Sequence, residues 1–354
     1  MNETISTTLR ERAEGDVHIE WLLDAVHAGA RRQRRRRIAL SCAAVAAVVA
    51  AGVVTVATNG SDGPPDGPAD QPPTVLAPPP VPPRVTGFAS AVDSPAAFGS
   101  DATLFHLDLA DLSGWRHIAW AAQVGHEELI ASTPDGDELY LEASRDPAQL
   151  APMPGPTSAI TVNGLPAETG RLSERTGPRP DRHAIRWQPL PGIWAQVQAT
   201  GAIDVALHAA RGLRLDGVRR CAVPFRLPQV TAQLVKCNTY ATVDQRTGAW
   251  MAAGGVWFRL GPPGTVEYQV AVGGDEQPVT PNATVKGREV EVVRGGIAAL
   301  EFRYRYGSRT AYFWAHGVPD ENAMRSMVAA FTPVEDPDPR AWPANPFGSA
   351  GRGG

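Results

Sequence analysis

The chain has 354 residues and a formal net charge of −4 at pH 7, and 43% of its residues are hydrophobic. This length suffices for two ordinary domains, and the hydrophobic fraction is typical of a chain that folds around a core. Residues 1–37 carry eight arginines and six acidic residues, so the net charge is +2 up to residue 37 and −6 beyond it. A mildly acidic main part argues against nucleic acid as a partner.

Six arginines directly precede a long uncharged stretch. Residues 38–58 contain neither a charged residue nor a proline. At about 1.5 Å per residue, such a helix spans the roughly 30 Å hydrocarbon core of a bilayer. We therefore expect a single transmembrane helix over 38–58, with the N-terminus cytoplasmic and the later residues outside the cell membrane. The arginines that set this orientation are Arg31, Arg32, Arg34, Arg35, Arg36 and Arg37.

The main alternative to this anchor is a cleaved signal peptide, with Thr55-Val56-Ala57 as its cleavage site. The apolar run is longer than a usual signal core, and 37 residues precede it, which favours the anchor. Residues 1–30 include a helical apolar pattern around residues 17–26. This tail is interpreted as a docking site for a cytoplasmic regulator, as a helix on the inner leaflet, or as a segment without a specific role.

The layout of tail, arginine run and single span resembles that of actinobacterial single-pass regulators, including anti-sigma factors. The use of 31 arginines and only two lysines also resembles proteins of GC-rich bacteria. The tail has His18 and His27 but no cysteine, so it lacks the His/Cys zinc cluster common in those tails. The resemblance therefore implies a regulatory layout and does not extend to sigma-factor binding.

Residues 59–84 are predicted to be a disordered linker, because ten of the residues 59–83 are proline. Such a linker is extended, at about 3.1 Å per residue, and separates the later residues from the membrane. Beyond it lie two cysteines, Cys221 and Cys237, which we expect to form a structural disulfide. Two buried free thiols are the alternative.

The main part of the chain contains an internal repeat, with offsets of 117 to 123 residues between its members. This period suits two whole domains rather than a solenoid. We infer an extracytoplasmic module 1 at residues 85–219 and a module 2 at residues 220–336. The matching stretches are 105–107 with 225–227, 120–121 with 240–241, 161–164 with 284–287, and 185–187 with 302–304.

Each module shows alternating strand patterns followed by one helix, which predicts an α+β fold with an antiparallel sheet backed by a helix. The fold class is therefore two tandem antiparallel-sheet-plus-helix modules behind one transmembrane helix. Residues 337–354 are rich in Pro and Gly and are expected to be a disordered tail. The clearest strands are predicted at 103–109, 115–123, 184–188, 193–200, 265–272, 300–306 and 310–315, and the helices at 204–215 and after Asp320.

An anchor, a spacer and antiparallel modules with a glycine turn, an aromatic strand pair and a closing helix are similar to LolA/RseB-type extracytoplasmic sensor modules. The similarity of layout covers most of residues 85–336. It implies a concave sheet face that holds a lipid or a peptide.

No catalytic motif is found in the sequence. Residues 126–130, His-Glu-Glu-Leu-Ile, begin like a zincin helix, but the second histidine is replaced by Ile130, and the segment is interpreted as a strand. His106, His117 and His126 fall in neighbouring predicted strands and are interpreted as cross-strand residues rather than metal ligands. We therefore expect a protein that is not an enzyme, without a metal or a cofactor.

The aromatic residues of the last strand suggest a ligand face. Strand alternation places Tyr312 and Trp314 on one face and Phe313 on the other. Arg303 and Arg305 lie beside them in the preceding strand and complete the candidate ligand face. The alternative is that the aromatic pair belongs to the core.

The sequence is compatible with three functions. The first is a membrane-anchored extracytoplasmic binding or sensor protein of the bacterial envelope, with an envelope protein or small ligand outside and a regulator on residues 1–30 inside. The second is a tethered ligand- or lipid-binding module with an inert tail. The third, an exported enzyme, requires converging polar groups that the sequence does not display.

Overall fold

The computed structural model describes residues 78–347 except 134–136, 154, 173–181, 229, 231, 245–246, 261–265, 275–277, 296–299 and 344. These described residues belong to one compact unit. The expected cytoplasmic tail, the transmembrane helix over 38–58 and linker residues 59–77 all lie outside the described residues. Among the described residues, no helix is both long and apolar enough to cross a bilayer.

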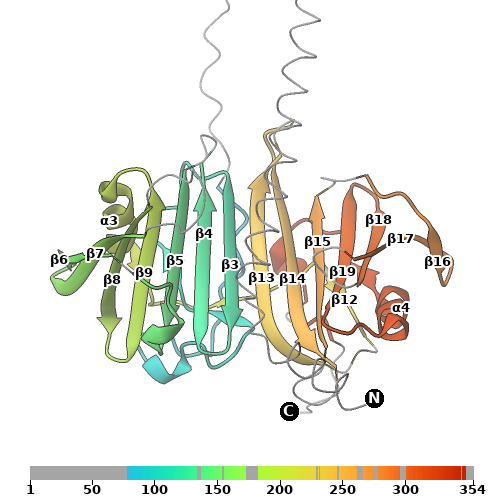
Figure 1. Ribbon diagram of the computed structural model, residues 1–354, viewed down its shortest axis with the longest axis horizontal. Coiled ribbons are helices and arrows are strands. Elements are labelled where there is room, and N and C mark those ends of the chain that lie inside the picture. The colour runs from blue at the N-terminus through green and yellow to red at the C-terminus, as the bar shows by residue number, and fades with distance from the viewer. Residues whose placement is uncertain are drawn as a thin grey trace, which may run out of the picture. The chain divides into compact units, whose positions relative to one another are not determined.

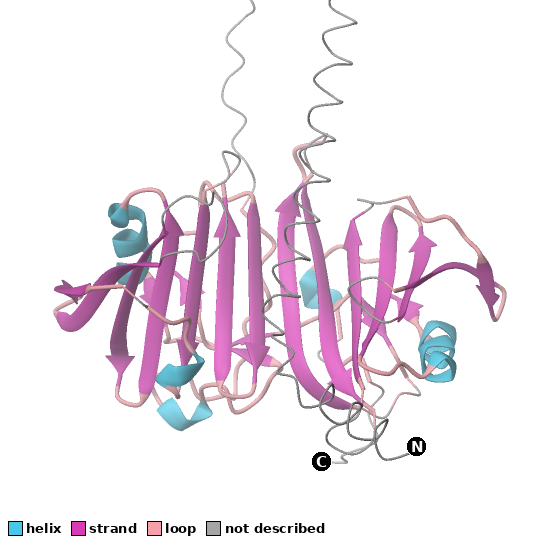
Figure 2. Ribbon diagram, in the orientation of Figure 1, coloured by secondary structure: helices cyan, strands magenta, loops and turns pink. Residues whose placement is uncertain are grey.

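One large antiparallel sheet dominates the described part of the chain, which confirms a sheet-rich α+β fold (Figures 1 and 2). We call β3–β9 the first half-sheet and β13–β19 the second. The first contains β3 (His117–Gln123), β4 (His126–Ser132), β5 (Glu138–Ser144), β6 (Thr157–Val162), β7 (Leu165–Leu172), β8 (Arg182–Leu190) and β9 (Ile193–Thr200). The second contains β13 (Gln233–Val243), β14 (Trp250–Arg259), β15 (Glu267–Gly274), β16 (Ala283–Val285), β17 (Arg288–Arg294), β18 (Leu300–Tyr306) and β19 (Arg309–His316).

Short elements surround this sheet. Two helices were expected, and the structure has α3 (Ile203–Arg211) and α4 (Glu321–Ala330). The short strand pairs are β1 (Leu104–Phe105) with β11 (Arg219–Arg220), β2 (Asp108–Leu109) with β10 (Leu213–Arg214), and β12 (Phe225–Arg226) with β20 (Thr332–Pro333). The 3-10 helices are η1 (Pro95–Ala97), η2 (Pro147–Gln149) and η3 (Pro339–Ala341).

The strand order is the same on both sides of the sheet's middle. From the central pair β3–β13 outward, the first half-sheet runs 3-4-5-9-8-7-6 and the second 13-14-15-19-18-17-16. The β6–β7 and β16–β17 hairpins both turn through a non-glycine residue of positive φ, Asn163 (φ 50) and Lys286 (φ 45), followed by a glycine. Positive φ at both turn positions is typical of the two-residue type I′ hairpin.

One of the sequence matches is out of register. Trp120 on β3 is fully buried on the core face, and it pairs with Thr239 on β13. Tyr240 is the next residue along, so it lies on the opposite face. The match of 120–121 with 240–241 is therefore wrong, because a register shift by an odd number of residues exchanges the two faces of a strand.

The core lies on the face of the sheet that the two helices cover. Helix α3 buries Ala206, Ala209 and Ala210, and it ends at Arg211 rather than at 215, because the Gly212 N–H closes its last turn on the carbonyls of His208 and Ala209. Helix α4 starts as expected at Asp320, whose carboxylate accepts from the Asn322 N–H at 2.8 Å. It buries Met324, Met327 and Val328.

The described parts of two segments that were expected to be disordered, residues 78–84 and 337–347, belong to the folded unit. At the end of the linker, the carbonyl oxygens of Pro82 and Pro83 accept hydrogen bonds from Arg219 and from the Arg220 N–H. In the C-terminal tail, Trp342 is 2% exposed, and its indole N–H donates to the Asp336 carbonyl at 2.7 Å. The expected boundaries at residues 84 and 337 are corrected accordingly.

The expected disulfide is present between Cys221 and Cys237, with 6.2 Å between the two Cα atoms. Both cysteines are buried. The bond ties the segment before β12 to the middle of the sheet at β13, a position consistent with a structural role.

Candidate functional site

A pocket of about 580 Å³ opens between α3 and the core face of the sheet. Leu139 of β5 forms its floor, Val205 and Ala209 of α3 form one wall, and the segment after β2 forms another. This volume lies within the range of small-molecule sites, and the lining is mainly apolar. The lining residues are Leu109, Ala110, Asp111, Trp115, Leu139, Asp204, Val205, His208, Ala209, Arg211 and Gly212.

A second pocket of about 810 Å³ adjoins the first, because both are lined by residues 109–111 and Trp115. Its other walls come from residues 78–84, from the chain around β10 and β11, and from Trp250. Arg219 in this wall is already engaged: its Nη2 lies 2.7 Å from Asp108 Oδ2. The two pockets therefore share a wall at residues 109–111, and the second pocket also has charged side chains in its lining.

The rim of the first pocket carries both signs of charge. The Ser113 N–H donates to Asp111 Oδ1 at 2.8 Å, and this bond is the main reason that the pKa of Asp111 lies below its usual value. His208 adds a smaller effect in the same direction. The Asp111 carboxylate therefore stays charged at neutral pH, opposite the exposed His208 and Arg211 of α3.

The structure brings the four residues of the predicted ligand face together on the outer face, which we define as the sheet face opposite the core. The rings of Tyr312 and Trp314 are parallel within 3°, with centroids 5.2 Å apart. Arg303 pairs directly with Tyr312 across β18 and β19, and Arg305 pairs with Thr310. Phe313 between them is fully buried in the core, so the predicted alternation is confirmed.

The charge of Arg303 is balanced by two carboxylates. Its guanidinium lies 2.7 Å from Glu301 Oε1 and 3.4 Å from Glu291 Oε2. The hydrogen bonds to Glu301 are the main cause of a raised Arg303 pKa. Arg303 is therefore not a spare cation for an anionic partner, although its remaining N–H groups can still donate hydrogen bonds.

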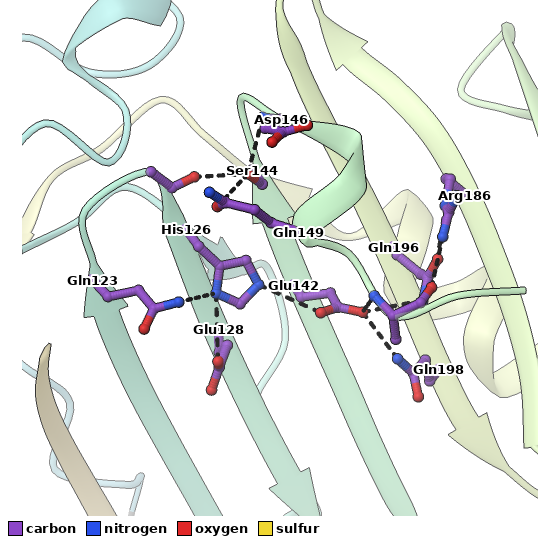
Figure 3. Close-up of polar contacts among 12 residues, drawn as sticks. Gln123, His126, Glu128, Glu142, Ser144, Asp146, Gln149, Arg186, Gln196 and Gln198 are labelled. Atoms are coloured by element: carbon purple, nitrogen blue, oxygen red, sulfur yellow. Dashed lines mark hydrogen bonds and ion pairs between the residues drawn. The ribbon is translucent and has the colours of Figure 1, made fainter. Parts of the chain in front are cut away.

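The outer face of the first half-sheet carries a polar cluster that no sequence motif indicated (Figure 3). Glu142 Oε1 accepts from Gln196 Nε2 (3.0 Å) and Gln198 Nε2 (2.9 Å). Arg186 Nε donates to Gln196 Oε1 at 2.8 Å. The four residues come from three strands, β5, β8 and β9, so only the strand register brings them together. The alternation of polar residues along β9 was the one signal available in the sequence.

The three histidines do not converge. His106 and Glu127 pair on the core side of the sheet. His117 and His126 lie at opposite ends of the β3–β4 hairpin, where they pair with Ser132 and Gln123 respectively. Residues 126–130 lie in strand β4, as interpreted. In the part of the chain that the structure describes, no group of three or more His, Cys, Asp or Glu side chains is arranged to hold a metal ion.

Comparison with known proteins adds no family assignment. No protein-family model matches the sequence, and no curated protein matches it significantly. The pockets and the outer face are therefore the features of the molecule that bear on its function.

Proposed function

We propose that this chain is a single-pass, membrane-anchored binding protein of the bacterial envelope, with its cytoplasmic N-terminus held by the Arg31–Arg37 run and its sheet domain outside. The uncharged residues 38–58 and the arginines before them support the anchor and its orientation. The Cys221–Cys237 disulfide supports an oxidising compartment for the sheet domain. The proposal involves no catalysis.

We also propose that the sheet consists of two copies of one module, joined edge to edge by β3 and β13. The identical strand order of the half-sheets and the matching turns at Asn163 and Lys286 support this duplication. The match of residues 185–187 with 302–304 supports it further, because Arg186 and Arg303 occupy the same position relative to β9 and β19.

In this proposal, the pocket beneath α3 binds an amphipathic small molecule. The observation that carries it is the apolar 580 Å³ space between Val205, Ala209 and Leu139, with the charged Asp111 and Arg211 at its mouth. Burial of an alkyl chain contributes about 0.8 kcal/mol per CH₂ group, so a chain of moderate length suffices for micromolar binding. The likeness of layout to LolA/RseB-type modules is consistent with such a ligand.

The test is a titration of the full chain, in a detergent that does not compete, with an environment-sensitive fluorescent fatty acid. Ala209→Trp fills the pocket and is expected to lower the affinity about tenfold or more. Ser326→Trp adds the same indole to the exposed side of α4 and should leave binding unchanged. Equal loss in both variants, or no binding by the wild type, would reject the pocket as the ligand site.

The role of the tail separates two versions of this function. In the regulatory version, ligand binding outside changes the contact of residues 1–30 with a cytoplasmic regulator. In the tethered-module version, the tail has no such role. Deletion of residues 1–30 distinguishes them, because it abolishes the cellular response to ligand only in the regulatory version.

A further inference from the structure

On the outer face of the first half-sheet, side chains bind the backbone of one residue of the chain itself, Ala151. The N–H of Ala151 donates to Glu142 Oε1 at 3.0 Å. The carbonyl oxygen of Ala151 accepts from Arg186 Nη2 (2.6 Å) and from Gln196 Nε2 (3.0 Å). Both backbone polar groups of Ala151 are therefore satisfied by the polar cluster of β5, β8 and β9.

The segment around Ala151 crosses the strands of this half-sheet. Leu150 has extended backbone angles (φ −76, ψ 150) and is 4% exposed. Met153 lies over β7, where a side chain at Gly170 would meet its Cε at 3.1 Å. The outer face of the first half-sheet is thus a seat for an extended polypeptide, and residues 150–153 occupy it.

The three positions that hold Ala151 have equivalents in the second half-sheet. Gln196 has Arg186 as its neighbour on β8 and Glu142 as its neighbour on β5. Tyr312 has the corresponding neighbours on β18 and β15. The equivalent pairs are Gln196 and Tyr312, Arg186 and Arg303, and Glu142 and Ala271.

The connection that covers the first seat is shortened in the second half-sheet. Residues 145–156, twelve in number, connect β5 to β6, whereas residues 275–282, eight in number, connect β15 to β16. The second half-sheet also has aromatic rings where the first has amides, because Tyr312 and Trp314 replace Gln196 and Gln198. Its outer face therefore offers a stacked aromatic surface in place of a polar one.

We propose that this aromatic seat, formed by Tyr312, Trp314, Arg303 and Ala271, binds an extended proline-containing segment of a partner protein. Ala271 replaces the carboxylate that accepts the bound N–H in the first half-sheet, so an N–H at this point would be buried without an acceptor. Proline has no N–H to satisfy, and its ring packs well on aromatic faces.

Arg303 retains the capacity to bind the carbonyl of such a segment. Its Nε, Nη1 and Nη2 each make one hydrogen bond, to Glu301 and Glu291. A guanidinium has five N–H groups, so two of them remain free to donate to a carbonyl oxygen. Arg186 donates to the Ala151 carbonyl oxygen in the first half-sheet. The seat thus combines one carbonyl donor with an apolar platform.

This inference rests on the proposed duplication and is independent of the pocket beneath α3. Its test is isothermal titration calorimetry of the full chain with capped twelve-residue peptides, one of alternating proline and alanine and one of alternating glycine and alanine. The proline peptide should bind, and Trp314→Ala should lower its affinity about tenfold. Trp194→Ala is the matched control, since it removes the same residue type from the outer face of the first half-sheet and should have no effect.

A second variant tests the chemistry of the seat. Ala271→Glu restores the carboxylate of the first half-sheet, so the preference for the proline peptide over the glycine peptide should fall at least about fivefold. Circular dichroism checks that each variant folds. Equal binding of both peptides by the wild type, no binding of either, or no effect of Trp314→Ala would overturn the proposal. Tighter binding of a peptide of residues 62–77 would assign the seat to this chain's own linker instead of a partner.

The two proposals fail separately. Loss of fatty-acid binding in Ala209→Trp concerns only the pocket, and loss of peptide binding in Trp314→Ala concerns only the aromatic seat. A chain that binds the fatty acid and neither peptide keeps its pocket function and lacks the peptide site.

Discussion

The imidazole Nδ1 of His106 lies 2.7 Å from Oε1 of Glu127, and each side chain is only 1% exposed. The other carboxylate oxygen accepts from the backbone N–H groups of His106 (2.6 Å) and Leu107 (3.0 Å). Glu127 thereby joins the segment between β1 and β2 to strand β4 inside the core. A carboxylate with three partners in an apolar interior fixes one arrangement of these two elements.

Removal of this carboxylate should destabilise the fold strongly. Glu127→Ala leaves two backbone N–H groups and the imidazole without their acceptor, and we expect a loss of about 3 kcal/mol in the free energy of unfolding. Glu128→Ala, the neighbouring half-exposed residue, removes a partner of Lys236 and should cost about 1 kcal/mol or less. Urea denaturation followed by circular dichroism measures both. If the two variants lose the same amount of stability, the buried hydrogen bonds of Glu127 add no more to stability than the ion pair of Glu128.

The disulfide should stabilise the sheet domain. Because Cys221 and Cys237 are 16 residues apart, the chain-entropy argument gives about 3 kcal/mol for the closed loop. The double variant Cys221→Ala/Cys237→Ala should unfold at correspondingly lower urea concentration, and the wild type should match it after reduction. A wild type that is unaffected by a strong reductant would contradict a structural bond.

Stability should fall at alkaline pH because of Tyr306. Burial raises the pKa of its phenol to about 12, from 10.0, and nearby Arg309 only partly opposes this. Because the pKa of Tyr306 is higher in the folded state than in the unfolded state, its contribution to the stability of the fold is complete below pH 10. That contribution is lost as the pH rises towards 12. Tyr306→Phe should therefore remove about 2 kcal/mol of pH dependence in this window. The measurement is the free energy of unfolding of both proteins at pH 9 and at pH 11.5. If the variant loses as much stability between these pH values as the wild type does, the prediction is wrong.

The proposed orientation in the membrane is tested by cysteine labelling. In a Cys42→Ala background, a membrane-impermeant maleimide should label Asn59→Cys in intact cells, and Ala30→Cys only after permeabilisation. Labelling in the reverse order would invert the topology. A mature chain that lacks residues 1–57 would establish a cleaved signal peptide in place of the anchor.

Local patterns in the sequence were sufficient for part of the fold. Strands β9 and β18 match their predicted ranges, β8 and β19 extend beyond theirs by one or two residues at each end, and α4 starts at its predicted cap, because alternation and capping depend on residues close in sequence. The face of Tyr312 and Trp314 followed from the same alternation. The order of the strands in the sheet and the extent of the terminal segments did not follow from any local pattern.

The sequence by itself determined that the main part of this chain is rich in antiparallel strands, with two helices and one cysteine pair. Only the tertiary structure decided that Thr239 pairs with Trp120, so that the two half-sheets become one continuous sheet. It also brought Glu142, Arg186 and Gln196 to the backbone N–H and C=O of one residue, Ala151. Such contacts join residues far apart in sequence, and their geometry depends on strand register, which leaves no local pattern for a sequence to display.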